Sequence, residues 1–399
     1  MKKDGKIIAI VVIVTLIVVL ALLSCIIFLQ MTKKDDSKEN KVSTLNETNT
    51  IKNEVVTPTD SDSEDIEIIP TMEDEVVADT AWCPTFQLVW NDMKNELVEQ
   101  DVEFIDGDEP KYLENLNDEL FTEEDISDEY YYKKWGVKSN KLKDEILEGV
   151  KEKFDEDSDV IDESDDWGDG KDKSAHVFYA MLKKVFEYEN PFDILDEGVF
   201  EHEGKWFENV KYFGIAESTK EEVKDQVTIL YYEDNDNFAF SVATKDGDEV
   251  IFAKGVKGKT FAKIYEEIEK SADEYTGSEK MEEKDTLKIP NLKFNMLKEY
   301  KELEKKEIAC KNGDEIIIEK ALQTIKLEMD NKGGKIKSEA IIMTKETAME
   351  EEEPPKKMNL DGEFVVFVKE EDKDLPYFAL KVSDISKFQE GIEKLLIEE

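Results

Sequence analysis

The sequence predicts an α+β domain carried behind one N-terminal membrane-spanning helix. Residues 7–31 contain no charge, and about 20 apolar residues are enough to cross a bilayer as a helix. Beyond them, many short strand-like runs mix with a few helical ones, without the regular alternation of a parallel α/β fold. With 40% hydrophobic and 10% aromatic residues, the chain is too apolar for general disorder.

The apolar segment 7–31 is the first element. It is longer than the apolar core of a cleaved signal peptide, and no A-x-A-like site follows it. The run Leu-Leu-Ser-Cys ending at Cys25 resembles a lipobox, so Cys25 is a candidate lipidation residue. Residues 26–29 stay apolar, which favours the uncleaved helix. Three lysines precede the helix, so we expect residues 1–6 in the cytoplasm and the bulk of the chain outside.

A polar segment, residues 32–79, follows the predicted anchor. Its Ser, Thr, Asn, Asp, Glu and Lys residues show no sustained apolar periodicity. We therefore expect a flexible linker with an r.m.s. span of roughly 40 Å. The folded extracytoplasmic domain is expected to occupy residues 80–399, which is long enough to bury a sizeable core.

Periodicity predicts the elements of this domain in order. Apolar residues at helical spacing predict helices over 85–99, 111–120, 141–154 and 259–273. The run 175–188 fits either a helix or a buried strand. Strands are predicted over 209–214, 227–233, 236–243, 249–253, 286–296, 314–318, 321–330, 364–370 and 376–382.

Charge and cysteine content restrict the partners and the compartment. The 53 basic residues, all lysine, face 98 acidic ones, which gives a net charge of −45. Such a domain repels nucleic acid, so no nucleic-acid partner is expected. Outside the anchor only Cys83 and Cys310 are present, and they fit either a disulfide in an oxidising compartment or two free buried thiols.

Sequence patterns of enzymes and metal sites are absent. His176 and His202 stand in no ligand or triad spacing, and no phosphate-binding loop, dinucleotide-binding or nucleophile-elbow motif occurs. The acidic segment 155–173 places Val160 where a calcium loop starting at Asp155 requires glycine. We therefore expect a solvated loop there, no metal, no cofactor and no enzymatic activity.

Four segments, in this order along the chain, carry a family resemblance. They are FYAMLKKVFEYENPF (178–192), the paired runs VTILYY (227–232) and NFAFSV (237–242), LKIPNLKF (287–294), and the region 321–370. Together they resemble serpins over about 175–385, whereas 85–170 matches that family poorly. The resemblance implies a serpin-like fold, with a large mixed sheet, smaller sheets and a cluster of helices.

The resemblance also implies a function. In serpins, a serine or cysteine protease cuts an exposed reactive loop, which then joins the sheet as an extra strand and traps the protease as an acyl-enzyme. Here that loop would span about 334–358. From Gly334 onward, small or apolar residues alternate with mostly charged ones, as in a strand. An ordinary strand followed by an ordinary surface loop is the competing interpretation.

Specific loop residues follow from the same resemblance. The hinge residues would be Asn331, Gly333, Gly334, Ile336, Ser338 and Ala340. The candidate scissile region is Thr347, Ala348, Met349, Glu350 and Glu351. Counting forward from Gly333 gives the Thr347–Ala348 bond, whereas counting back from Pro354 gives a later one.

The hinge departs from the inhibitory pattern of the family. Residues 335–339 read KIKSE, where inhibitory serpins carry a run of alanine that favours rapid insertion. Slow insertion turns an inhibitor into a substrate. The alternatives are therefore a suicide inhibitor, a non-inhibitory serpin-fold binding domain displayed at the cell surface, and an unrelated extracytoplasmic α+β domain that binds a partner.

Overall fold

A computed structural model describes residues 59–60, 66–334 and 355–396. The helices are α2 (Thr85–Asp92), the π-helix η1 (Met93–Val98), α3 (Leu113–Asn117), α4 (Asn140–Phe154), α5 (Glu221–Lys224) and α6 (Phe261–Glu274), with short 3-10 turns η2 (Glu123–Asp125), η3 (Asp128–Tyr130) and η4 (Ile385–Lys387). Among these residues no helix is both long and apolar enough to cross a membrane. The predicted anchor, 7–31, and Cys25 lie outside the described residues.

The strands fall into one large sheet and several small ones. Their bounds are β1 (Thr59–Asp60), β2 (Glu67–Ile69), β3 (Thr80–Trp82), β4 (Tyr131–Val137), β5 (His176–Leu182), β6 (Phe186–Glu187), β7 (Asp193–Ile194), β8 (Gly198–His202), β9 (Lys205–Val210), β10 (Tyr212–Ile215), β11 (Val227–Asp234), β12 (Asn237–Ala243), β13 (Asp248–Lys254), β14 (Thr286–Pro290), β15 (Leu292–Glu299), β16 (Glu307–Ala309), β17 (Glu315–Ile317), β18 (Leu322–Met329), β19 (Gly333–Gly334), β20 (Lys357–Asn359), β21 (Phe364–Glu370), β22 (Phe378–Val382) and β23 (Glu393–Leu396).

The seven-stranded sheet has the order β11-β12-β13-β21-β22-β3-β2. All its neighbours are antiparallel except the β2–β3 pair, so the sheet is mixed, as expected. Its central strands are buried on both faces, which explains their nearly continuous apolar sequences. The amphipathic helix α6 covers part of it, with Phe261 and Tyr265 both in edge-on contact with Phe367.

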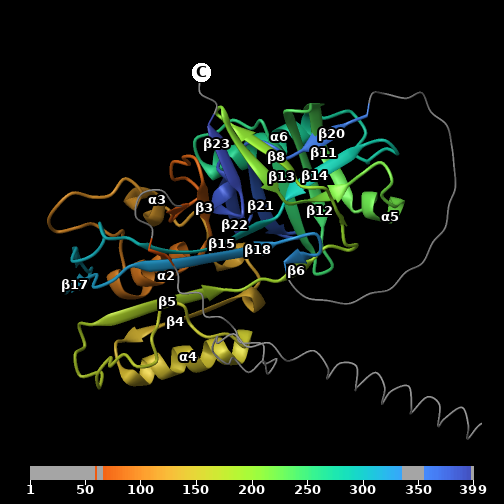
Figure 1. Cartoon of the computed structure of the whole chain (residues 1–399). Coiled ribbons are helices and arrows are strands. Elements are labelled where there is room, and N and C mark those ends of the chain that lie inside the picture. The colour runs from red at the N-terminus through yellow and green to blue at the C-terminus, as the bar shows by residue number, and fades with distance from the viewer. Residues whose placement is uncertain (1–58, 61–65, 335–354, 397–399) are drawn as a thin grey trace, which may run out of the picture. The chain divides into compact units, whose positions relative to one another are not determined.

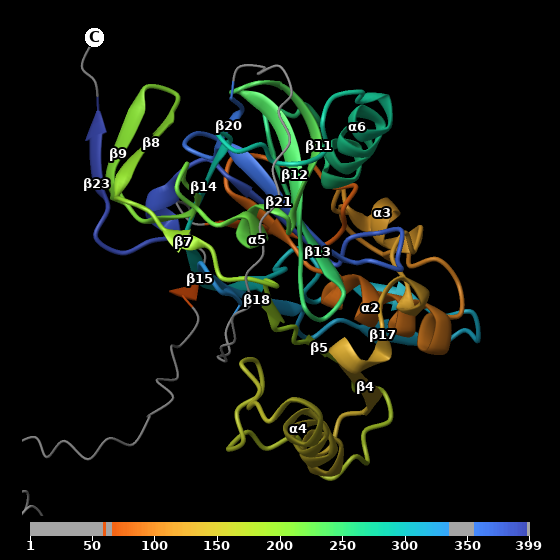
Figure 2. The same ribbon diagram turned by 90° about the vertical axis from the view of Figure 1, so that its right-hand side faces the viewer.

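A second layer is divided into two pieces. β15 pairs with β18, and the short β1 extends the β15 side in parallel. β4 pairs with β5 over seven residues, and α4 packs on this pair (Figures 1 and 2). The smaller sheets are β20-β14-β10-β7, β23-β9-β8 and the hairpin β16–β17. Most of the helices and strands predicted from periodicity are thus present. The sequence did not show which strands belong to the same sheet.

The predicted linker boundary is wrong by at least fourteen residues. Ile66, Ile68, Ile69 and Met72 are buried in the main core, so the folded domain begins before residue 66 and not at residue 80. Pairing of β2 with β3 buries this segment. Its sequence, DIEIIPTM, is short and flanked by acids, so its apolar residues formed no recognisable pattern.

Both cysteines within the described residues are free and buried. The disulfide alternative for Cys83 and Cys310 is therefore excluded in this structure. Burial raises the pKa of the Cys83 thiol to about 11, which keeps it protonated and unreactive at neutral pH. In the described part of the chain, no group of three or more His, Cys, Asp or Glu side chains could hold a metal ion.

Candidate functional site

A slot separates β5 from β18. Within the described residues β5 pairs with β4 and β18 pairs with β15, and the two strands belong to different sheets (Figure 1). A cavity of about 830 Å³ lies between them and is lined by residues from both strands. Two strand edges that face a cavity leave backbone N–H and C=O groups available to a further strand.

Helix α2 forms one wall of the slot. Phe86, Val89 and Trp90 line it, because the apolar face of this amphipathic helix is turned toward the strands. The side-chain amides of Gln87 and Asn91 fix the helix by donating to the backbone carbonyls of Leu116 and Phe121, both at 2.9 Å.

Gln323 joins β18 to the start of α2. Its Nε2 donates to the Cys83 carbonyl at 2.8 Å and to Thr85 Oγ1 at 3.1 Å, and its Oε1 accepts from the Tyr300 hydroxyl at 2.7 Å. All of these bonds are buried, so they are strong in the low local dielectric. This network holds the β18 side of the slot at a fixed position relative to α2.

The segment after α4 lines the slot from another side. Residues 156–167 contribute Val160, Ile161 and Trp167 to the cavity lining. Lys143 on α4, itself buried, donates to the carbonyls of Glu163 and Asp165 at 2.5 and 2.6 Å. The acidic segment is a mostly exposed loop, as expected, and the ammonium of Lys143 holds part of it in place.

At one end of the slot, the chain leaves β18 in a tight turn. Asp330 and Gly333 exchange two backbone hydrogen bonds, at 3.1 and 3.2 Å. The chain then reverses, and β19 pairs antiparallel with β6, with Gly333 opposite Glu187 and Gly334 opposite Phe186. Since β6 follows β5 along the chain, the first residues of the predicted loop lie between the β18 side and the β5–β6 side.

The turn is fastened to the β6 segment by main-chain and side-chain bonds. The Asn331 carbonyl accepts from the Phe192 N–H at 2.8 Å, and Asn331 Nδ2 donates to the Phe192 carbonyl at 3.0 Å. The Tyr188 N–H donates to the Lys332 carbonyl at 3.1 Å. Tyr188 and Phe192 contact each other edge-on beneath the turn, with 5.0 Å between ring centroids.

Glycine is required at position 333. Its φ is +114°, and a Cβ there would lie 2.4 Å from the Phe186 carbonyl oxygen and 2.8 Å from the Glu187 Cα. Any other residue would both strain the backbone and clash with β6. The structure thus gives a second reason, besides flexibility, for the glycine pair in the sequence.

The structure places only part of the predicted site. Asn331, Gly333 and Gly334 come together at the end of the slot. The remaining hinge residues, Ile336, Ser338 and Ala340, and the whole scissile region, Thr347, Ala348, Met349, Glu350 and Glu351, lie outside the described residues. Their assignment stays a prediction.

The point where the described chain resumes after the loop was not predicted. The buried carboxylate of Asp285 accepts from the Lys356 N–H at 2.7 Å and from the Glu282 N–H at 2.9 Å. β20 then pairs in parallel with β14. In a chain with 38% charged residues, nothing in the sequence distinguishes this aspartate from its exposed neighbours.

Comparison with known proteins gives structural neighbours only. No family model matches the chain, and no curated protein matches it. One similar structure is Serpin48, a highly specific serpin in the insect Tenebrio molitor, with 14% identity and a TM-score of 0.47 over 77% of this chain and 92% of that one. A serpin, the family that the sequence resembles, is thus among the structural neighbours. Another similar structure is thyroxine-binding globulin in complex with thyroxine, with 15% identity and a TM-score of 0.39 over 61% of this chain and 64% of that one.

Proposed function

We propose that the chain is a membrane-tethered, extracytoplasmic serpin-like protein that inhibits serine or cysteine proteases as a suicide substrate. The slot between β5 and β18, with Gly333 and Gly334 at its end, is the observation that carries the proposal. A protease that cuts the loop would free its N-terminal part to continue along the slot as a strand.

The register at the hinge supports this motion. Gly334 lies opposite Phe186, and continuing the antiparallel register would bring Ser338 opposite Leu182 on the β5 side. On the other side, the antiparallel bridge between Asp330 and Gly333 sets the register of the loop against β18. Continuing that register would bring Ser338 opposite Ile325. Because residues opposite one another share a face, the buried side chain of Ile325 indicates that even-numbered loop residues would point into the core.

The composition of the loop agrees with that register. The even positions 334, 336, 338, 340 and 342 are Gly, Ile, Ser, Ala and Ile, whereas 335, 337 and 339 are Lys, Lys and Glu. Small or apolar side chains would therefore enter the core, and charged ones would remain on the other face. A one-residue slip would bury the lysines, so the pattern supports insertion in this register alone.

A non-inhibitory binding domain is the second candidate. Ile336 would pass the buried side chain of Lys184, which lines the same slot, and a β-branched residue fits more slowly there than alanine. If insertion is slower than hydrolysis of the acyl-enzyme, the protease is released and the loop is only a substrate. In that case the predicted anchor and linker would hold the domain at the membrane so that it can bind a partner.

Incubation with a panel of serine and cysteine proteases tests the proposal. An inhibitor forms a covalent adduct that survives denaturing electrophoresis, and the cleaved protein melts more than about 10 °C higher because a strand has been added. Cleavage with full protease activity remaining and no rise in Tm contradicts insertion and favours the binding domain. A rise in Tm without an adduct identifies slow insertion.

Matched loop variants test the register itself. Ser338→Glu would place a charge in the core and should abolish both the adduct and the rise in Tm, because an unpaired buried carboxylate is costly. Lys337→Glu changes a residue on the opposite face and should preserve both. Equal behaviour of the two variants would show that the proposed register is wrong.

The membrane location is a separate part of the proposal and rests on residues 7–31. We expect the protein in the membrane fraction, resistant to alkaline extraction, with its domain accessible to protease added outside the cell. Cys25→Ser should leave the protein membrane-bound if the helix is the anchor. Release of that variant into the soluble fraction would instead establish Cys25 as the lipid attachment site.

A further inference from the structure

A buried lysine and a buried aspartate meet beside the slot. Lys184 lies between β5 and β6, and Asp248 is the first residue of β13. Lys184 Nζ is 2.8 Å from Asp248 Oδ2, and the two side chains are 4% and 0% exposed. Such complete burial of a charged pair is unfavourable, because removing both ions from water commonly costs more free energy than their attraction returns.

Aromatic groups enclose the pair. The ring centroid of Tyr130 is 3.3 Å from Lys184 Nζ, and the Tyr377 hydroxyl donates to Asp248 Oδ1 at 3.2 Å. The two carboxylate oxygens therefore have different roles: Oδ2 faces the amine, and Oδ1 faces a hydrogen-bond donor. A donor on Oδ1 stabilises the negative charge that builds up on this oxygen when a nucleophile attacks Cγ.

A third carboxyl group lies next to the pair. Glu370, 6% exposed, is directly opposite Asp248 in the β13–β21 register, and both its oxygens accept hydrogen bonds from Ser127. Burial raises the pKa of Asp248, and the charge of Glu370 raises it further, so both effects favour its protonated carboxylic acid. Burial alone would lower the pKa of Lys184, but its contacts with Asp248 and Tyr130 raise it, so the amine becomes nucleophilic only when it passes a proton to Asp248.

We propose that Lys184 and Asp248 condense to form an intramolecular isopeptide bond. A proton passes from the Lys184 ammonium to Asp248 Oδ2, and the neutral Nζ attacks Asp248 Cγ. The C–N bond forms, the bond from Cγ to Oδ2 breaks, and a second proton from Nζ leaves with Oδ2 as water. No oxidant, reductant or cofactor takes part, and exclusion of bulk water from the pair opposes the reverse hydrolysis.

The molecule contains a matched pair that lacks these features. Lys356 and Asp285 are also buried, with 6% and 1% exposed side chains, but Lys356 Nζ is 3.6 Å from Asp285 Oδ2. Two backbone N–H groups already donate to the two oxygens of the Asp285 carboxylate. Because the amine is farther away and both oxygens are held by other donors, we expect this second pair to stay unlinked.

The bond would join two parts of the fold. Lys184 belongs to the strand segment that receives the hinge, and Asp248 belongs to the seven-stranded sheet. Linking them would hold the β5–β6 side of the slot in place against the main core. The inference does not depend on protease inhibition, because it concerns the protein as folded and before any cleavage.

Mass spectrometry of the purified full chain under denaturing conditions tests the proposal. The expected mass is lower than that of the sequence by one water molecule, and a tryptic digest should contain a branched peptide joining Lys184 to Asp248, with no cleavage after Lys184. A full-length mass with separate, unmodified peptides for both residues overturns the proposal. A branched peptide at Lys356 and Asp285 would contradict its structural reasoning.

Two variants complete the test. Lys184→Met combined with Asp248→Leu removes both charges together, so it avoids an unpaired buried ion and should fold with the full mass of its sequence. Glu370→Gln keeps both reacting groups and removes the neighbouring charge, so the linked fraction should fall. Loss of water in the double variant would place the modification elsewhere and overturn the assignment.

Discussion

Gly333 shows how one residue can set the geometry of the candidate site. Its positive φ turns the chain back from β18, and its missing side chain lets the backbone approach β6. A hinge was predicted here because glycine pairs are conspicuous in a sequence, and the structure shows a tight turn at this position. The steric requirement imposed by Phe186 could not be predicted, since the two segments are far apart in the chain.

Substitution of this glycine should distinguish the backbone strain of a positive φ from the steric clash of an added Cβ with β6. Gly333→Ala adds a Cβ that meets the β6 backbone, whereas Gly204→Ala has a similarly left-handed φ of +74° and no atom within 4 Å of its added Cβ. We expect both variants to lower the free energy of unfolding measured in urea. The decrease should be about 1–3 kcal/mol larger for Gly333→Ala than for Gly204→Ala. Equal losses would mean that β6 does not press on the hinge.

Which charged residues are buried could not be predicted from the sequence. Asp248 and Asp285 are enclosed, although each belongs to a charged stretch that resembles solvated surface, and the sequence gives no sign that the side chain of Lys184 is buried with Asp248. Whether a carboxylate is buried depends on which distant segments pack over it. Composition supplies no information on that packing, so these residues were found only in the structure.

Among the secondary-structure elements, β5 shows why the sequence run 175–188 fitted either a helix or a strand. Val177, Tyr179 and Met181 face the cluster around α4, whereas Phe178 faces the cluster around α2. A strand covered on both faces loses the alternation of apolar and polar residues that identifies strands. Only its partner β4 settles the assignment, and β4 was not predicted.

Two predicted strands were each split in the structure. The run 286–296 divides after Pro290 into β14 and β15, which belong to different sheets. Proline cannot donate to a ladder, so a change of sheet at this position is physically reasonable. The run 209–214 divides likewise between β9 and β10, and the β8–β9 hairpin before it was missed.

The stability of helix α4 and of the acidic segment that follows it in sequence should depend on Lys143. Lys143→Met removes the buried ammonium that donates to the Glu163 and Asp165 carbonyls, and a hydrogen bond to a charged group contributes about 1.5–3 kcal/mol. We expect faster amide exchange over residues 158–167. The control, Lys141→Met, removes an exposed i,i+4 pair with Glu145 and should leave both stability and amide exchange nearly unchanged.

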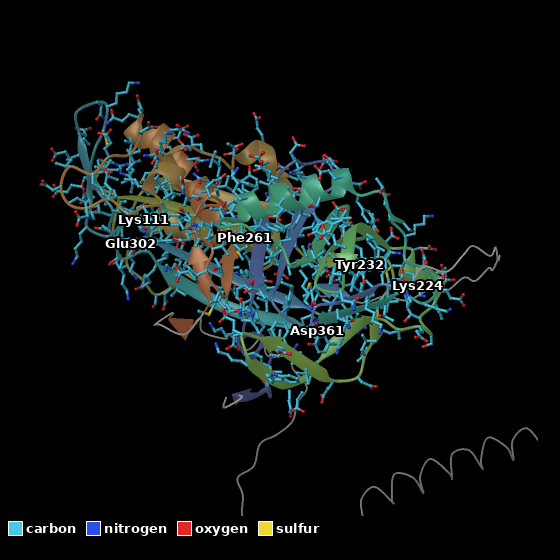
Figure 3. All side chains as sticks on the ribbon, turned by 90° about the horizontal axis from the view of Figure 1, so that it is seen from above. Lys111, Lys224, Tyr232, Phe261, Glu302 and Asp361 are labelled. Atoms are coloured by element: carbon cyan, nitrogen blue, oxygen red, sulfur yellow. The ribbon has the colours of Figure 1, made fainter. Side chains whose placement is uncertain are left out.

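For the whole molecule, charge is the dominant property. The net charge of the full chain is −45. Polar side-chain ends lie around the outside of the described domain (Figure 3), whereas Phe261 is buried. Like charges repel in the compact state, and salt screens them over about 10 Å at 0.1 M. Raising NaCl from low to physiological concentration should therefore raise Tm in calorimetry. A falling Tm would mean that ion pairs outweigh the repulsion.

The position of β21 and β22 has a consequence for any protease that reaches the loop. Both strands follow the loop in sequence, and both lie inside the seven-stranded sheet, between β13 and β3. A cut within 347–351 would therefore give two polypeptides that share one core. The nicked protein would keep its elution volume in gel filtration and separate only in denaturant, so the cut leaves the folded domain whole.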